Sequence, residues 1–276
     1  MPFHRDSEEH VIPNHSQAIK VMRYSRRREG WKHIPRHPKT HSPSSLPTSF
    51  RLVTWNVEAF WPHAADRILC ALRHLEEEQL EVIESENDEE LPEHSVICLQ
   101  EVSIEAFQAL RRDTWVQENF YITPSSEAKW PEGAGYGNVT LIQSDMVVHH
   151  ASIIHYMTST MQRTALVVDL CLGFPRTNPT LEKTVRVVNT HLESPVPDGL
   201  DEQFIANQSR LTQLKVCSHL AFDRDIDLGA VVVGDMNCVT EEDKEAPGQL
   251  MLTDLVAPTE SRRMDVDDPE NKEFRK

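Results

Sequence analysis

The chain lacks the features that mark several large classes of protein. Its 276 residues contain no apolar run near the roughly 18 residues of a membrane-spanning helix. The first ten residues are polar and include Asp6, Glu8 and Glu9, so neither a secretory leader nor a transit peptide is expected. There is no glycine-rich phosphate loop of the Walker kind and no dinucleotide-binding fingerprint after a first strand. Membrane spans, secretion and the common nucleotide-binding enzymes are therefore disfavoured.

Paired or clustered cysteines are also lacking. The five cysteines are scattered and odd in number, and they show no metal-ligand spacing. Three of them lie in or beside apolar runs, which suits small buried side chains in a reducing compartment. We therefore expect an intracellular protein, in the nucleus or the cytoplasm, without disulfides and without a zinc site. The cysteines are Cys70, Cys98, Cys171, Cys217 and Cys238.

Positive charge is scarce in most of the chain. Residues 1–50 carry 9 Lys and Arg against 4 Asp and Glu, whereas residues 51–276 carry 19 against 40. The net charges of the two parts are thus +5 and −21. A body this acidic repels a nucleic-acid backbone. Any chemistry on a phosphate group there would require a bound cation and local basic groups.

The sequence predicts three regions. Residues 1–48 have few periodic apolar positions and many His, Pro, Ser and Arg, which predicts a mostly disordered basic arm that docks through Trp31 and Ile34. The cluster Arg26–Arg28 is compatible with a nuclear signal or a phosphate contact, although most such runs are simply solvated. A folded domain is predicted over residues 49–257 and a charged, disordered tail over residues 258–276.

Strands and helices alternate within the predicted domain, which indicates a mixed α/β fold. The run Val231–Val233 has the composition of a strand buried on both faces, and Trp55 is expected in the core. Helices are predicted at residues 64–80, at 104–112 with Ser103 as N-cap, and at 201–220. The apolar stripe of the last helix is predicted to consist of Phe204, Ile205, Leu211, Leu214 and Val216. Strands are predicted at residues 50–56, 95–99, 138–143, 147–156, 164–172, 184–189 and 230–237, with a rim loop at 124–137.

Four of the predicted strands end in polar groups that suit one kind of site. They end at Asn56, at Gln100–Glu101, at Asn189–His191 and at Asp235–Asn237, the last directly after Gly234, which lets the backbone turn. Carboxylate and amide oxygens are the ligands that Mg²⁺ and Mn²⁺ prefer. The set therefore points to metal-assisted attack of water on a phosphate ester. Taken singly, each group has a plainer interpretation as an Asx turn, a helix cap or a solvated strand end.

The four strand ends lie in motifs that resemble those of the endonuclease/exonuclease/phosphatase superfamily, in the family's order. The motifs are Thr54–Glu58, Leu99–Val102, Asn189–Ser194 and Gly234–Asn237, and they span most of the chain, from Leu52 to Asp254. The string Asn-Thr-His-Leu-Glu-Ser is the most specific and resembles the 5′-tyrosyl-DNA phosphodiesterase branch. The resemblance implies two packed β-sheets flanked by helices in four layers. It also implies a Mg²⁺- or Mn²⁺-dependent phosphodiesterase that acts on a phosphate ester such as DNA or protein-linked DNA.

The resemblance implies roles for the metal-binding side chains. Glu101 would be the direct metal ligand, with Asn56 beside it. Glu58 stands where many members have Asp, as a second acidic group near the metal. Asn56 would also contact the substrate.

The resemblance further implies roles in hydrolysis. Asp235 would orient and deprotonate the attacking water, and Asn237 would hold the phosphate and fix Asp235. His191 and Ser194 would contact phosphate oxygens. Glu193 has a plainer interpretation as the partner of a surface arginine.

The sequence departs from the family at two places. The family's terminal Ser-Asp-His motif and final strands do not follow Asp235, so the chain resembles a member truncated at its C-terminus. The alternative to an active enzyme is therefore an impaired pseudoenzyme or a truncated product. After Asn237 the tyrosyl-DNA branch has Leu-Arg-Asp where this chain has Cys238-Val239-Thr240, which weakens the expectation of a phosphotyrosyl–DNA substrate. A nucleic-acid-binding module built on the basic arm is a third, less favoured hypothesis, and the sequence does not indicate an oligomeric state.

Overall fold

The computed structural model describes residues 15–34, 46–84, 94–173, 182–195, 200–223 and 225–253. These residues form two β-sheets. The five-stranded sheet has the order β1 (His15–Ala18), β8 (Val147–His155), β9 (Thr164–Gly173), β10 (Glu182–His191), β11 (Ala230–Asp235). The six-stranded sheet has the order β3 (Gly30–His33), β2 (Met22–Ser25), β6 (Phe120–Thr123), β7 (Tyr136–Gln143), β5 (Ser95–Ser103), β4 (Arg51–Asn56).

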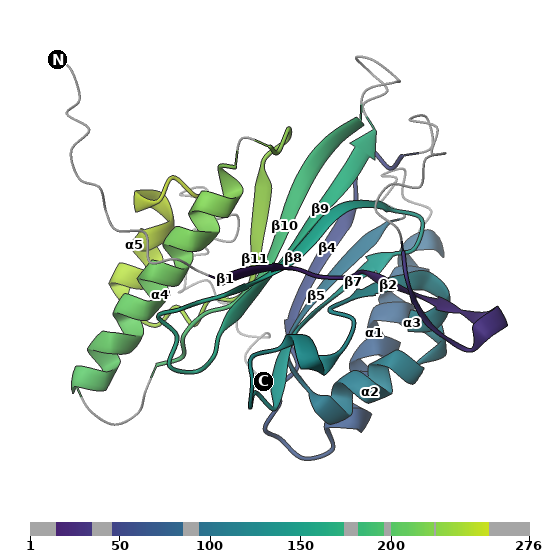
Figure 1. Cartoon of the computed structure of the whole chain (residues 1–276), viewed down its shortest axis with the longest axis horizontal. Helices are drawn as coiled ribbons and strands as arrows, with labels where there is room; N and C mark the ends of the chain where they lie inside the picture. Colours follow the sequence, from purple (N-terminus) through teal and green to yellow (C-terminus); the bar gives the residue numbers. More distant parts are fainter. Residues whose placement is uncertain are drawn as a thin grey trace, which may run out of the picture.

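Helices cover the outer face of each sheet, so that the molecule has four layers (Figure 1). The six-stranded sheet is covered by α1 (Ala64–Glu84), α2 (Ile104–Arg112) and α3 (Thr114–Asn119). The five-stranded sheet is covered by α4 (Leu200–Ala221) and α5 (Glu241–Gln249). Two short 3₁₀ turns, η1 (Arg26–Arg28) and η3 (Glu127–Lys129), complete the helical elements of the described residues. The predicted fold class, two mixed sheets flanked by helices, is confirmed.

The main core lies between the two sheets. It is built from alternate side chains of β8, β9 and β10 on one side and of β5 and β7 on the other, with Val96, Ile142 and Leu170 fully buried. Burying a side chain of this size contributes about 1.5–3 kcal/mol. The pairs β4–β5 and β10–β11 are parallel and the other strand pairs are antiparallel.

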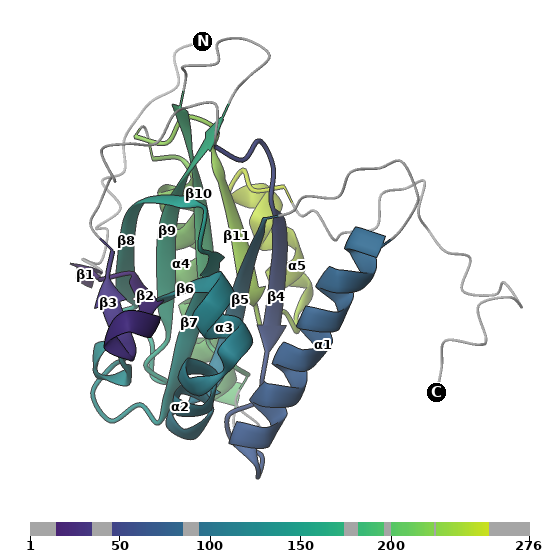
Figure 2. The ribbon, with the colours of Figure 1, turned by 90° about the vertical axis from the view of Figure 1, so that its right-hand side faces the viewer.

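The two parallel pairs bring the strand ends with polar residues together. In the register of these pairs Asn56 lies opposite Gln100, and His191 lies opposite Asp235. Figure 2 shows β11, β5 and β4 side by side where the two sheets meet. The carboxyl ends of the strands that carry the four motifs therefore lie at one edge of the sandwich.

The prediction of a mostly disordered arm over residues 1–48 is wrong for residues 15–34. β1 pairs with β8, and β2 pairs with both β3 and β6. Four-residue strands show no readable period, and these are fixed by the sheet edges that they pair with. Trp31 and Ile34 do dock this segment, Trp31 by donating its indole N–H to Arg111 O at 3.2 Å. Residues 1–14 and 35–45 and the predicted tail over 258–276 lie outside the described residues.

Two predictions of burial are also wrong, and a third is wrong in part. Val231–Val233 are half-buried rather than buried on both faces, because β11 is the last strand of its sheet. Trp55 is 38% exposed on β4 for the same reason. On α4, the predicted apolar stripe is confirmed at Leu211, Leu214 and Val216, which pack against the five-stranded sheet, but it is wrong at Phe204 and Ile205, which are 64% and 52% exposed.

Side-chain capping hydrogen bonds mark the N-termini of α2 and α5. Ser103 caps α2 as predicted, with its hydroxyl accepting from Ala106 N. α5 was not predicted, because its sequence is polar and contains Pro247. It is stabilised instead by a capping box in which Thr240 and Asp243 each accept from the other's backbone. Among the described helices, none is long and apolar enough to cross a membrane.

Candidate active site

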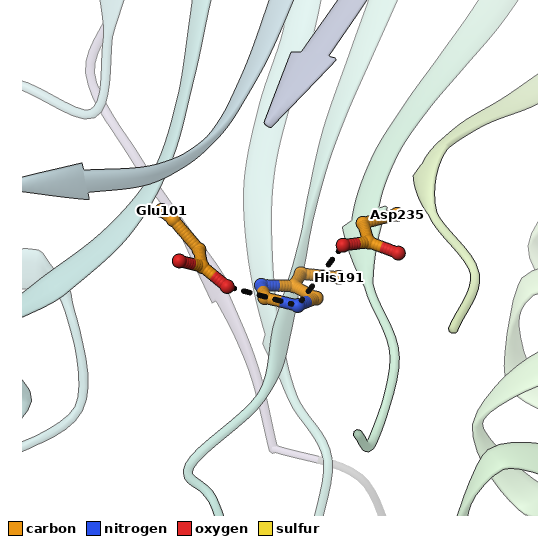
Figure 3. A group of neighbouring side chains, drawn as sticks. All are labelled: Glu101, His191 and Asp235. Atoms are coloured by element: carbon orange, nitrogen blue, oxygen red, sulfur yellow. Dashed lines mark ion pairs between the residues drawn. The ribbon is translucent and has the colours of Figure 1, made fainter. Parts of the chain in front are cut away.

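The ends of β5, β10 and β11 place three titratable side chains around one small space. Ligand atoms of Glu101, His191 and Asp235 all lie within 4.8 Å of one another (Figure 3). Asn56 at the end of β4 joins them by donating its Nδ2–H to Asp235 Oδ2 at 2.8 Å. Four of the predicted site residues are therefore neighbours, although Asn56 and Asp235 are 179 residues apart in the chain.

Two irregularities of the backbone aim these side chains. The pairing of β5 with β7 slips between Leu99 and Val102, and Glu101 within this bulge has a left-handed φ of 54°. Bulges re-aim side chains in this way. Gly234 has a φ of 138°, and a Cβ there would lie 1.8 Å from Thr190 O of β10. Only glycine permits β11 to approach β10 this closely and carry Asp235 to the edge.

Asp235 is held firmly but stays open to solvent. Its Oδ1 accepts from the backbone N–H of Asn237 at 3.0 Å, and its Oδ2 accepts from Asn56. Its side chain nevertheless keeps 30% of its exposure, so water can reach it. The Asn237 side chain donates to Leu192 O at 2.9 Å, which ties the end of β11 to β10.

Glu101 presents one carboxylate oxygen to the site. Oε2 accepts from Ala59 N at 3.1 Å, while Oε1 lies 3.6 Å from His191 Nε2. Glu58 is exposed and is not a member of the three-residue group. Its backbone N–H donates to Asn56 Oδ1 at 2.9 Å and so orients the Asn56 amide.

Arg163 is a site residue that the sequence analysis missed. Its Nη1 lies 2.8 Å from His191 Nδ1 and donates to Tyr136 Oη at 3.0 Å, and its Nη2 donates to Ser194 Oγ at 2.6 Å. The residue is only 5% exposed. It lies in a turn without a motif, and the only signal in the sequence is its place directly before the fully buried strand β9.

The contact with Arg163 fixes which nitrogen of His191 carries the proton. A guanidinium has only donors, so Nδ1 must accept and the neutral ring must be protonated at Nε2. Burial and the charge of Arg163 hold the pKa of His191 well below its ordinary value, so the ring is neutral. Nε2 is buried and makes no hydrogen bond. A buried N–H without an acceptor suits a phosphoryl oxygen, and a protonated nitrogen cannot coordinate a metal.

The remaining donors fit a hard divalent cation. With His191 excluded, the groups that face the shared space are the carboxylates of Glu101 and Asp235 and the neighbouring amide of Asn56. Two carboxylates this close repel each other unless a positive charge lies between them. Mg²⁺ and Mn²⁺ prefer such oxygen ligands and fill the remaining positions with water.

A pocket of about 390 Å³ lies beside His191. The predicted rim loop supplies one wall, including Gly133 and Tyr136, and Phe60 and Arg163 supply another. The rings of Phe60 and Tyr136 meet edge to face at 5.1 Å, and the Arg163 guanidinium lies 5.8 Å from the Tyr136 ring. The pocket offers a partly aromatic site for a group attached to a bound phosphate.

Comparisons with known proteins give similar folds at low identity. No family model and no curated protein matches the chain. The matched structures include TDP2 from Caenorhabditis elegans, with 20% identity over 70% of this chain and 48% of that chain and a TM-score of 0.47. D. rerio TDP2 complexed with a single-strand DNA product matches with 18% identity over 74% of this chain and 65% of that chain, at a TM-score of 0.47. The human Nocturnin catalytic domain with bound sulfate matches with 16% identity, 75% and 72% coverage and a TM-score of 0.44.

All three of these proteins have the endonuclease/exonuclease/phosphatase fold. The chain spans about half the length of the C. elegans structure that it matches. At this identity and TM-score, the likeness by itself assigns no activity to the chain.

Proposed function

We propose that the chain is a divalent-metal-dependent phosphoesterase of the endonuclease/exonuclease/phosphatase type, and more specifically a phosphodiesterase. One observation carries the proposal. The oxygens of Glu101 and Asp235 face the same space as the unpaired N–H of His191, with the charge of Arg163 behind it. Ligands for a cation and donors for an anion thus lie side by side, as hydrolysis of a phosphate ester requires.

The metal would be Mg²⁺ or Mn²⁺, and Glu101 and Asn56 would hold it, with Glu58 as a further acidic group at the rim. When bound, the cation supplies positive charge to the phosphoryl group and polarises the bond that breaks. Asn56 also orients Asp235 through the 2.8 Å hydrogen bond between them. The Asn56 amide would thus contact both the metal and Asp235, the residue proposed as the base.

The protein's own groups perform the rest of the chemistry. Asp235, held by Asn56 and by the backbone of Asn237, accepts a proton from the attacking water. His191 donates its Nε2–H to a phosphoryl oxygen. Ser194 accepts from Arg163, which leaves its own O–H free to donate to the same phosphate. Asn237 keeps the base in place through its backbone N–H, and its side chain would also contact the phosphate.

The substrate is a phosphate ester whose leaving or flanking group is aromatic or a nucleoside. The pocket next to His191, with Tyr136 and Phe60 in its walls, supports this class. DNA or protein-linked DNA, as in the tyrosyl-DNA phosphodiesterase branch that the motifs resemble, belongs to it. A place in DNA repair, in the nucleus or the cytoplasm, would follow from a substrate of this kind. Imaging a tagged chain in cells tests the compartment.

Hydrolysis of bis(p-nitrophenyl) phosphate tests the proposal. We expect turnover with Mg²⁺ or Mn²⁺, none with EDTA, and losses of about 10²–10³-fold for Glu101→Gln and Asp235→Asn. Asp145→Asn is the matched control, because this carboxylate is 61% exposed and pairs with His94 away from the site. Unchanged rates in both site variants would reject the assigned roles.

A second candidate is a protein that binds the same ligands without turnover. This candidate predicts that Mn²⁺ and inorganic phosphate bind in a Glu101-dependent manner while no phosphodiester is hydrolysed. Measurable metal-dependent turnover that Asp235→Asn abolishes rules it out.

A further inference from the structure

Glu193 carries a buried carboxylate that the roles above do not use. It lies two residues after His191 and is 1% exposed. Five donors converge on its two oxygens. They are Thr160 N, Thr160 Oγ1 and Met161 N at 2.8, 2.5 and 3.1 Å from Oε1, and Ser159 Oγ and Gln213 Nε2 at 2.7 and 3.0 Å from Oε2. The expectation that Glu193 pairs with a surface arginine is wrong.

Four of these five donors belong to the turn that leads to Arg163. Within the turn, Ser159 Oγ accepts from Met161 N at 3.2 Å and from Arg163 N at 2.8 Å. The Glu193 carboxylate thus holds Ser159, and Ser159 holds the backbone of Arg163. The Arg163 side chain then reaches His191 and Ser194. An unbroken series of hydrogen bonds connects Glu193 to the phosphate-facing groups.

Helix α4 holds Glu193 from the other side. Gln213 Oε1 accepts from Glu193 N at 2.8 Å, and Arg210 Nη1 donates to Glu193 O at 3.1 Å. Arg210 is itself 2% exposed and is fixed by Asp243 of α5 at 2.9 and 3.0 Å. The position of the carboxylate is therefore set by the packed body of the protein rather than by the turn that it organises.

The carboxylate is in its charged form. Burial alone would raise the pKa of Glu193, but hydrogen bonds from Thr160, Ser159 and Gln213 outweigh it and hold the pKa below its ordinary value. An ionised carboxylate has only acceptors and can serve all five donors. A neutral amide in its place would have two lone pairs and two N–H groups, so it would meet the donors of the turn with donors of its own.

We propose that Glu193 is a positioning residue, which holds the Ser159–Arg163 turn so that Arg163 fixes the Nε2-protonated form of His191 and orients Ser194. The inference rests on the proposed function for its catalytic consequence. The arrangement of the protons, however, can be measured without any turnover.

The variant Glu193→Gln tests the proposal, with two measurements on the full chain. The first is the long-range ¹H–¹⁵N spectrum of His191 at pH 8, assigned by the signals that are lost in His191→Asn. We expect the Nε2–H form in the native chain and a mixture of the two neutral forms in Glu193→Gln. The second is kcat/KM on bis(p-nitrophenyl) phosphate, for which we expect a loss of about 10–100-fold.

Asp169→Asn is the matched control. Asp169 of β9 is likewise a buried carboxylate, 4% exposed, and its Oδ1 accepts from Arg186 Nε at 2.7 Å. Arg186 lies on β10, five residues before His191. The control should lower stability without changing the His191 spectrum or the rate per folded molecule. A merely structural role for Glu193 predicts that Glu193→Gln behaves in the same way as this control.

Ser159→Ala guards against a Glu193 variant that does not fold. It removes the hydroxyl that links the carboxylate to Arg163 N while Glu193 keeps its other partners, and it should change the His191 spectrum in the same direction. A native spectrum and rate in both Glu193→Gln and Ser159→Ala would overturn the proposal. A changed spectrum in a chain without turnover would support the positioning role and count against the proposed function instead.

Discussion

At the scale of single residues, the site depends on where protons and charges lie. Arg163 illustrates this, because its three contacts orient two groups that face the phosphate. A guanidinium makes these contacts from one rigid plane, whereas a lysine ammonium is a point charge on a flexible stem. The residue type, and not only its charge, therefore matters at this position.

Arg163→Lys should accordingly reduce kcat/KM by about 10²–10³-fold. The variant keeps the positive charge but loses the contacts to His191, Ser194 and Tyr136 as a set. Steady-state hydrolysis of bis(p-nitrophenyl) phosphate measures the effect. Arg73→Lys, on the exposed face of α1, is the control and should leave the rate unchanged. Equal rates for the two variants would show that Arg163 contributes only charge.

Gly234→Ala should destabilise the fold by about 3 kcal/mol or more. Its Cβ would overlap Thr190 O at 1.8 Å, and its φ of 138° is unfavourable for any other residue. Gly248→Ala, where a Cβ meets nothing within 4 Å, should lie within about 1 kcal/mol of the native chain. Urea unfolding of both variants compares them, and equal midpoints would contradict the close packing of β10 and β11.

At the scale of elements, the sequence predicted the strands that carry the motifs because their ends combine β-favouring runs with metal- and phosphate-binding groups. The sequence did not predict the elements that are stabilised mainly by contacts with distant parts of the chain. β1 to β3 are four-residue strands that gain order from β8 and β6. α5 has no apolar face and is held by Arg210, more than thirty residues earlier in the chain.

The same limit applies within the site. Recognisable local motifs contain Asn56, Glu101, His191 and Asp235. The sequence therefore predicted that these four side chains lie close together. Arg163 has none, and its role appears only when the turn after β8 is folded against Glu193. The tautomer of His191 follows from a contact across 28 residues that no local pattern encodes.

The N-terminus of α5 gives a prediction at this scale. Thr240→Ala removes the capping hydroxyl that accepts from Asp243 N, which should cost about 1 kcal/mol of unfolding free energy. Ser126→Ala is the matched control, because Ser126 precedes η3 without a side-chain capping bond. Chemical denaturation should show a loss for Thr240→Ala only. A similar loss in both would mean that the capping box does not stabilise α5.

At the scale of the whole molecule, two carboxylates, Glu193, which is buried, and Asp243, which is partly buried, link stability to pH. Hydrogen bonds hold the pKa of Glu193 and of Asp243 below their ordinary values of 4.5 and 3.8, against the opposing effect of burial. A carboxyl whose pKa is lower in the folded state stabilises the fold above its unfolded pKa. That stabilisation is lost as the pH falls through the folded value.

The free energy of unfolding should therefore fall as the pH drops from about 5 to 3. His191 adds to this loss of stability, because its pKa is lower in the folded state and the unfolded chain therefore binds its proton first as the pH falls. The double variant Glu193→Gln/Asp243→Asn isolates the carboxylates, because it should start less stable at pH 7 and lose less between pH 5 and pH 3. Urea titrations at fixed pH provide the data. If the free energy of unfolding falls equally in the native chain and the double variant between pH 5 and pH 3, these two carboxyls do not cause the loss of stability in acid.

The net charge of −16 gives a second prediction at this scale. A body this acidic gains little from counterion release on binding DNA, so the slope of log K against log salt should be shallow, about −2 or smaller in magnitude. Fluorescence anisotropy with a labelled single strand between 50 and 200 mM salt, in excess Mg²⁺, measures it. A slope near that of 6–10 phosphate contacts would point to an extensive basic surface instead.

In the proposed function, four distant strand ends form one site for a cation and a phosphate. Anomalous diffraction from crystals of the full chain soaked with Mn²⁺ and inorganic phosphate tests it most directly. We expect a single Mn²⁺ peak at the Glu101 carboxylate, with a phosphate oxygen within hydrogen-bond distance of His191 Nε2. A Mn²⁺ peak bound through His191, or phosphate bound away from these strand ends, would contradict it.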